Sequence, residues 1–408
     1  MAELSYMQTQ QLANIARGFE IEDGVVDIIE SFGSGRINGT YKVTIRQGAN
    51  RFEYLLQHIN NNVFPNTAGL MNNLTLVTEF VRRNGGAALN YIKCKDDVAE
   101  ERKNGPYIFV DDSAKHWRMY HYIDADVYPC IINSHHAFML GEAIANFSNS
   151  LDGFDTKCLI ETIPDFHNTP KRYKDLLVSV AHDTIENDAK RVIPVREYVK
   201  AIMDKEDKLG VLMNALESGA IPYRVVHNDP KLNNVLFDKA TAEPICMIDL
   251  DTIMPGTSLF DVGDALRSIA NTASEEDKTT DNVSFSTEIF EKFITGYIKG
   301  MHGKITAAEI KLIPESIWVI AMELGMRFLK DHIDGNKYFA TEYDGQNLER
   351  AKVQLKLAEC VYEKISTGEL HKIVHEIQGK VDNWCLGTST RLFWNWTSIV
   401  AETIIWNP

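Results

Sequence analysis

The spacing of apolar residues changes character between about residues 125 and 130, and this change limits the fold more than any other feature. Before it, short apolar segments are separated by turns containing glycine and asparagine, which is typical of antiparallel strands. After it, apolar residues recur with the period of amphipathic helices. An all-helical chain does not give the first pattern, and alternating strand–helix units do not give the second. We therefore expect an α+β fold.

Individual elements can be assigned from the same patterns. We expect strands at 25–32, 40–45, 52–59, 90–94, 106–111 and 116–124, and a helix over 66–86. Further helices are expected at 133–149, 172–190, 195–218, 287–300, 306–332 and 346–366, with short strands at 225–237 and 244–251. The prediction is a small antiparallel-sheet N-lobe (1–123) and a large, mainly helical C-lobe (124–380). A tryptophan-rich tail (381–408) follows, for which the sequence indicates no role.

Composition argues against several kinds of partner. The chain has 57 acidic and 42 basic residues among 408, which gives a net charge of −15, and it contains no run of Lys or Arg. We therefore expect no binding to nucleic acid or to anionic membranes. No stretch approaches the roughly 18 apolar residues of a membrane span, and no signal peptide is evident. The six cysteines form no C-x-x-C, so we expect reduced thiols and a cytoplasmic location.

A polar bend between two apolar runs, VVHNDPKLNNVLF (225–237), carries the strongest chemical signal. Lys231 follows Asp229 by two positions, Asn234 follows it by five, and Asp249 comes fifteen residues after that asparagine. This order matches the phosphoryl-transfer layout in which one Asp accepts the proton of the attacking hydroxyl. An Asn and a second Asp there hold Mg²⁺, which prefers hard oxygen ligands. A simple turn rich in Asn and Asp would explain any one of these residues. It is a much weaker explanation for all four at these spacings.

A glycine-rich hairpin upstream agrees with this interpretation. SFGSGRINGTYKV (31–43) places Gly33, Gly35 and Asn38 between two predicted strands, where a loop over nucleotide phosphates belongs. It is neither a P-loop nor a dinucleotide fingerprint, and alone it is a weak signal. The next strand should carry a cation for the α- and β-phosphates, but Gln57 stands there. We expect Gln57 to donate a hydrogen bond without supplying charge.

Four longer segments resemble one known family. HNDPKLNNVLFD, MIDLDTIMPGTSLFDVGDALR, NNVFPNTAGLMNNLTLVTEFVRR and MELGMRFLKDHIDGNKYFATEY are similar to the aminoglycoside phosphotransferase/choline kinase superfamily, and within it to the N-acetylhexosamine 1-kinases. The resemblance runs from about residue 15 to about residue 378. It implies a protein-kinase-like two-lobed fold and an ATP- and Mg²⁺-dependent reaction. Pro230 and Arg36 depart from the family pattern close to the site.

The resemblance also implies a role for each candidate residue. Asp229 would be the base, with Lys231 beside the transferred phosphoryl group. The Mg²⁺ ligands would be Asn234, Asp249 and Asp251. For Asp251, a carboxylate at the end of a strand with no metal role is an equally good explanation. Asp261 and His227 would hold the catalytic loop. The nucleotide would contact Gly33, Gly35, Asn38 and Gln57, and its adenine would contact Tyr122, Ile123 and Asp124. The sugar would contact Asp229, Arg327 and Tyr338, although a surface ion pair or a core position explains the last two nearly as well.

The expected function is a kinase that phosphorylates the anomeric hydroxyl of N-acetylglucosamine or N-acetylgalactosamine. Two alternatives stay open. The first is a kinase of the same fold for another sugar, choline, homoserine or an aminoglycoside, and the acidic balance favours a cationic acceptor. The second is a catalytically silent nucleotide-binding protein whose tail recruits a partner. The sequence indicates no oligomeric state.

Overall fold

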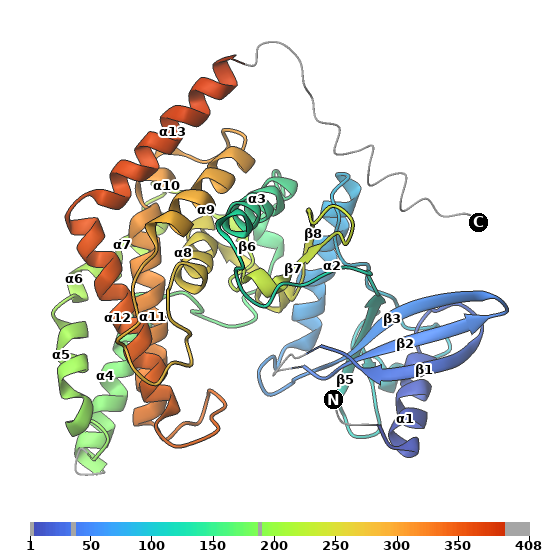
Figure 1. Cartoon of the computed structure of the whole chain (residues 1–408). Helices are drawn as coiled ribbons and strands as arrows, with labels where there is room; N and C mark the ends of the chain where they lie inside the picture. The colour runs from blue at the N-terminus through green and yellow to red at the C-terminus, as the bar shows by residue number, and fades with distance from the viewer. Residues whose placement is uncertain (1–3, 34–37, 187–189, 388–408) are drawn as a thin grey trace. The chain divides into compact units, whose positions relative to one another are not determined.

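The computed structural model describes residues 4–33, 38–186 and 190–387, which form two compact units (Figure 1). The first comprises residues up to Asp126 together with Gly153–Pro164 and Leu236–Pro255. The second comprises Val127–Asp152, Asp165–Val235 and the chain from Gly256 onward. The predicted lobes follow the order of the chain, whereas each of these units is assembled from separate segments. Residues 388–408 of the tryptophan-rich tail lie outside the described residues.

The first unit is built on a five-stranded antiparallel sheet in the order β1-β2-β3-β5-β4. Its strands are β1 (Val25–Ser31), β2 (Thr40–Gln47), β3 (Asn50–Ile59), β4 (Phe109–Val110) and β5 (His116–His121). Gln47 pairs with Asn50, so β2 and β3 are joined by a two-residue turn. Gly48 occupies that turn with φ of +61°, a conformation that favours glycine.

Two helices accompany the sheet. Helix α1 (Tyr6–Ala16) begins at a capping box formed by Ser5 and Gln8, and its Leu12 and Ile15 join a core cluster with residues of β2, β3 and β5. Helix α2 (Thr67–Arg83) buries Leu70, Leu74 and Val77, as its apolar spacing predicts. The unit also contains β7 (Val235–Phe237), β8 (Pro244–Met247) and β9 (Met254–Gly256), all or nearly all of whose residues belong to it. Three 3₁₀ turns, Glu100–Arg102, Thr156–Cys158 and Leu250–Thr252, complete it.

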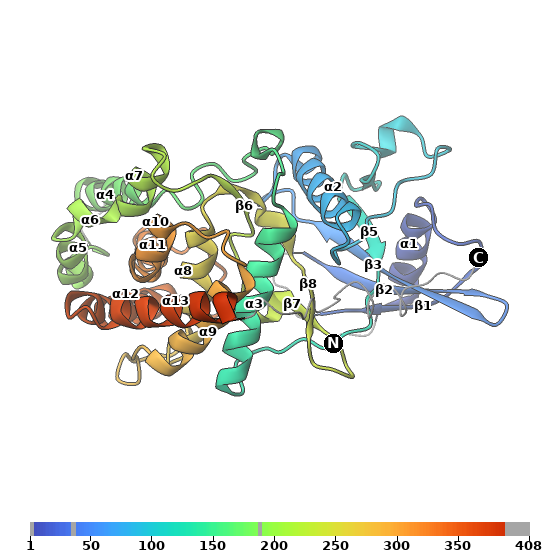
Figure 2. The ribbon, with the colours of Figure 1, turned by 90° about the horizontal axis from the view of Figure 1, so that it is seen from above.

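The second unit is helical and has α11 at its centre (Figure 2). Its helices are α3 (Ser134–Ser150), α4 (Thr169–Glu186), α5 (Arg196–Met203), α6 (Glu206–Leu209), α7 (Val211–Glu217), α8 (Ser258–Ile269), α9 (Thr287–Gly300), α10 (Ala307–Lys311), α11 (Ile313–Ile333), α12 (Gln346–Ser366) and α13 (Glu369–Gly387). Strand β6 (Arg224–Val226) and the 3₁₀ turns Ile193–Val195 and Leu232–Asn234 also belong to it. Helices α12, α8 and α4 pack against α11, which explains why α11 is buried over most of its length.

Several predicted elements differ in detail. The expected strand at 90–94 forms only isolated bridges, because Ile92 and Cys94 donate to carbonyls of different segments, Met119 and Pro106. The expected helix at 195–218 is divided into α5, α6 and α7, and that at 306–332 is divided before Pro314. Proline lacks the N–H that a continuous helix needs and fits the first turn of α11 instead. Among the described residues, no helix is long and apolar enough to cross a membrane.

Candidate active site

The predicted catalytic loop follows β6 in the second unit, and α8 fixes its backbone. The buried carboxylate of Asp261 accepts hydrogen bonds from the backbone N–H groups of His227 (3.0 Å) and Asn228 (2.7 Å). Asn228 has φ of +66°, which Asn tolerates better than most residues. The loop therefore keeps an uncommon conformation immediately before Asp229.

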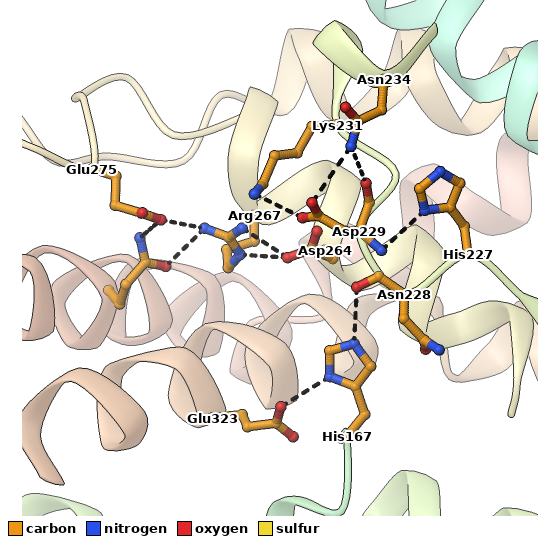
Figure 3. A network of polar contacts seen from close by, with 11 residues as sticks. His167, His227, Asn228, Asp229, Lys231, Asn234, Asp264, Arg267, Glu275 and Glu323 are labelled. Carbon is orange, nitrogen blue, oxygen red and sulfur yellow. Dashed lines mark hydrogen bonds and ion pairs between the residues drawn. The ribbon is translucent and has the colours of Figure 1, made fainter. Parts of the chain in front are cut away.

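Three of the predicted residues meet in this loop (Figure 3). The Lys231 ammonium lies 2.7 Å from Oδ1 of Asp229. Nδ2 of Asn234 donates to the backbone carbonyl of Asp229 at 2.8 Å and lies 3.4 Å from its Oδ2. Burial lowers the pKa of Lys231, but the carboxylates of Asp229 and Asp264 outweigh it and raise this pKa overall. A partly exposed carboxylate and a partly exposed cation thus lie beside the amide of buried Asn234.

Buried charges that the sequence analysis did not single out surround the loop. Arg267 on α8 donates to Asp264 and, from the other side of its guanidinium, to Glu275 (Figure 3). His167 lies between Glu323 and the carbonyl of Asn228. Polar residues on otherwise apolar helices were the available signal in the sequence for Arg267 and Glu323. No local pattern marks His167, which is brought to the loop by tertiary structure alone.

Asp249 and Asp251 lie in the first unit, beyond the end of β8. The predicted strand over 244–251 ends at Met247. Asp249 has φ of +57°, and Asp251 lies in the 3₁₀ turn Leu250–Thr252. A left-handed residue at the end of a strand changes the direction of the chain. The expectation that the two carboxylates share one strand is therefore wrong.

Asp251 belongs to a buried network with residues of the sheet. Its two carboxylate oxygens accept from Arg118 on β5 at 2.5 and 2.9 Å, and Nδ2 of Asn38 donates to Oδ2 at 2.7 Å. Gln57, which pairs with Arg118 across β3 and β5, accepts from the same guanidinium through Oε1. A buried cation on the neighbouring strand, Arg118, thus lies beside Gln57. An arginine within the apolar segment HWRMYHY was its sequence signal.

The remaining nucleotide candidates also lie in the first unit. Gly33 is exposed with φ of +76°, whereas Gly35 and Arg36 lie outside the described residues. Tyr122 and Ile123 are half-buried, and Asp124 is exposed. The Tyr122 hydroxyl lies 3.3 Å from Oδ1 of Asp124, and Lys42 lies over the Tyr122 ring.

Arg327 and Tyr338, the two predicted sugar contacts, lie together in the second unit. The Arg327 guanidinium faces the rings of Phe166, Tyr338 and Phe339 at 5.2–5.9 Å from their centroids. Buried Asp331 accepts from the backbone N–H groups of residues 337, 338 and 339, and so fixes the loop that carries Tyr338. Tyr338 is 62% exposed, so a ligand can reach it. A core position for Tyr338 is therefore wrong.

A polar cavity of about 380 Å³ opens beside the catalytic loop within the second unit. Lys231, Asn233, Arg267 and Glu275 line it, together with Pro129–Ile131. The volume lies within the range of small-molecule sites.

The donor atoms fit Mg²⁺ better than a transition metal. Among the described residues, no group of three or more His, Cys, Asp or Glu side chains is arranged to hold a metal ion. Magnesium needs no such group, since it commonly takes one or two side-chain oxygens and completes its coordination with phosphate and water. Asn234 uses Nδ2 toward Asp229, which leaves its Oδ1 for a cation.

Comparison with known proteins places these features in a family. Residues 28–282 match the model of the phosphotransferase enzyme family, APH. An aminoglycoside phosphotransferase from Alicyclobacillus acidocaldarius has a similar structure, with a TM-score of 0.56 at 11% identity, and the match covers 94% of this chain and 98% of that one. Choline kinase from Cryptosporidium parvum Iowa II gives a TM-score of 0.54 at 15% identity, covering 89% and 98% of the two chains.

A third solved structure is spectinomycin phosphotransferase in complex with ADP and spectinomycin, with a TM-score of 0.52 at 13% identity and coverage of 86% of this chain and 97% of that one. These likenesses confirm the predicted protein-kinase-like α+β fold, with a small antiparallel sheet and a large helical region. Because the family model also matches more than half of the residues, the chain belongs to the APH phosphotransferase enzyme family.

Proposed function

We propose that this phosphotransferase transfers the γ-phosphoryl group of ATP to the anomeric hydroxyl of N-acetylglucosamine or N-acetylgalactosamine, giving the sugar 1-phosphate and ADP. The observation that carries the transfer chemistry is the Asp229 carboxylate beside the Lys231 ammonium, in a loop held by Asp261. Use of ATP is supported by family membership and by the ADP bound to spectinomycin phosphotransferase. The choice of sugar rests on the sequence resemblance and on Arg327 and Tyr338.

In the proposed reaction, the sugar oxygen bonds to the γ-phosphorus as the bond from that phosphorus to the β–γ bridging oxygen breaks. The hydroxyl proton passes to Oδ2 of Asp229, and ADP leaves. Lys231 holds Oδ1 of the same carboxylate, which orients the base and places positive charge beside the transferred group. Asn234 and Asp249 would hold Mg²⁺, which neutralises phosphate charge when bound. Most of the catalysis should come from alignment, since the chemistry needs only a modest base.

The role of Asp251 needs revision within this proposal. Both of its oxygens accept hydrogen bonds from Arg118 or Asn38, so a metal would have to displace buried donors. We therefore give Asp251 the task of holding Arg118 and do not count it among the magnesium ligands. Gly33 would face the nucleotide phosphates, and Tyr122–Asp124 the adenine.

An ADP-release assay across a panel of acceptors tests the proposal. N-acetylglucosamine and N-acetylgalactosamine should be the best substrates among sugars, choline, homoserine and aminoglycosides, and the product should be the 1-phosphate by ³¹P NMR. A preference for choline, in line with the acidic charge balance and with the fold shared with choline kinase, would replace the sugar assignment. Absence of ADP release with every acceptor would leave a silent nucleotide-binding protein.

A further inference from the structure

His167 connects the central helix of the second unit to the catalytic loop (Figure 3). Its Nδ1 lies 2.9 Å from Oε1 of Glu323 on α11, and its Nε2 lies 3.3 Å from the backbone carbonyl oxygen of Asn228. His167 is 7% exposed and Glu323 is 1% exposed. A direct buried connection therefore runs from α11 to the residue that precedes Asp229.

His167 and Thr169 both contact the Glu323 carboxylate. Burial raises the pKa of Glu323, but His167, Arg327 and the Thr169 hydroxyl outweigh it and lower this pKa overall. The hydroxyl of Thr169 donates to Oε2 at 2.6 Å. The two oxygens that face the His167 ring are Oε1 of Glu323 and the carbonyl oxygen of Asn228, and both are hydrogen-bond acceptors.

The contact falls where the loop is most constrained. Asn228 has a left-handed backbone, and such a conformation persists only when its surroundings hold it. Its N–H donates to Asp261 on α8, while its carbonyl accepts from His167. Two elements thus hold the two polar backbone groups of Asn228. Rotation of the peptide between residues 228 and 229 would break the His167 contact and shift the Asp229 carboxylate.

Helix α11 also carries Arg327, one turn beyond Glu323 on the same face. Arg327 is the residue that we place at the acceptor, among the rings of Phe166, Tyr338 and Phe339. Phe166 immediately precedes His167. The same helix and the same short segment therefore support both the acceptor end and the base end of the proposed reaction.

We propose that His167 and Glu323 are positioning residues, which bridge α11 to the carbonyl of Asn228 and thereby set the Asp229 carboxylate against the acceptor hydroxyl. The proposal rests on the assignment of Asp229 as the base. It does not depend on which acceptor is used. A purely structural role for this buried pair would alter stability but would not act selectively through Asp229.

The test compares His167→Gln and Glu323→Gln with His375→Gln, the same histidine change at an exposed position of α13. Steady-state rates are measured with the best acceptor of the panel, in the wild-type and Asp229→Asn backgrounds. We expect His167→Gln to lower kcat by roughly 10- to 100-fold, because a shift of about 1 Å can cost that much, with KM for ATP unchanged. Glu323→Gln should act in the same direction, and the double variant should lose less than the product of the single losses.

The Asp229→Asn background separates positioning from general damage. Once the base is absent, His167→Gln should cause little further loss, because its effect passes through Asp229. An equal loss of kcat in both backgrounds would overturn the proposal, as would wild-type kcat in His167→Gln.

Amide hydrogen exchange gives a readout that needs no turnover, so it remains decisive if no acceptor is found. Exchange at His227–Asp229 should rise in His167→Gln and stay at the wild-type level in His375→Gln. Unchanged protection of these amides in a folded His167→Gln protein would overturn the bridge itself. If the wild type releases no ADP with any acceptor but His167→Gln shows the expected exchange, the proposed function is overturned. The contact between His167 and the loop is then still supported.

Discussion

The Asp251 carboxylate accepts hydrogen bonds from two nitrogens of the Arg118 guanidinium, at 2.5 and 2.9 Å, and both side chains are buried. Burial alone lowers the pKa of Arg118, but Asp251 outweighs it and raises this pKa overall. Arg118 and Asp251 are far apart in sequence, so the ion pair fixes the turn after β8 to the sheet of the first unit. Asp251 is one of the predicted magnesium ligands, and in the folded chain both of its oxygens accept hydrogen bonds from Arg118.

Asp251→Asn should destabilise the protein by about 3 kcal/mol, because it leaves the buried Arg118 without its countercharge. Urea unfolding without nucleotide and magnesium measures this loss, and Asp281→Asn, at an exposed position, serves as the control. Wild-type stability combined with a raised magnesium requirement would return Asp251 to the metal.

Asp229→Asn should lower turnover by roughly 10²- to 10⁴-fold, because it keeps the size of the side chain and removes the base. The rate of ADP release at saturating ATP and acceptor measures the effect, and the circular dichroism spectrum checks the fold. Near-normal turnover would remove Asp229 from the mechanism.

Asp249→Asn should raise the magnesium concentration needed for half-maximal rate, because a neutral amide holds the cation less strongly than a carboxylate does. A magnesium titration at fixed ATP measures the shift, with Asp281→Asn as the matched change. Superimposable titrations of Asp249→Asn and the wild type would contradict the ligand assignment.

Gly141→Ala should destabilise the second unit, because an added Cβ on α3 would lie 2.2 Å from the carbonyl oxygen of Phe293 on α9. Backbone atoms cannot yield as a flexible side chain does, so we expect a loss of at least about 1–3 kcal/mol. Gly379→Ala, on α13 with open space around the new Cβ, is the control and should be neutral or slightly stabilising. Equal melting temperatures for the two variants would show that α3 and α9 are not packed this closely.

The ionised Glu309 side chain should stabilise the folded protein in a pH-dependent way, and Glu309→Gln should remove this stabilisation. Burial raises the pKa of Glu309, but hydrogen bonds from Arg224 and Thr306 outweigh it, and the folded-state pKa lies below the usual value. Folding therefore favours the ionised form. The stabilisation is complete above the unfolded-state pKa and is lost as pH falls through the folded-state pKa.

The difference in unfolding free energy between the wild type and Glu309→Gln should accordingly be largest near neutral pH, on the order of 3 kcal/mol, and should shrink in acid. Urea titrations at pH 7 and pH 4 measure it. A difference that stays constant between these pH values would show that the charge of Glu309 contributes nothing to stability.

The sequence by itself determined the fold class, most of the elements and the polar bend at 225–237. Strand alternation and helical periodicity are local patterns, so β1 to β3, α2, α9 and α12 lie close to their predicted positions. Asp229, Lys231 and Asn234 are also near neighbours in the chain, and a short loop between apolar segments must bring them together. Breaks within helices were missed where they depend on a single proline or on packing, as before Pro314.

Only the tertiary structure decided which distant charges meet. Arg118 reaches Asp251, and His167 reaches both Glu323 and Asn228, across separations that no local pattern records. A buried charge costs free energy unless a partner is present, so the fold selects these pairs through burial and not through spacing. For this reason Asp251 looked like a metal ligand in the sequence, whereas in the folded chain it holds an arginine.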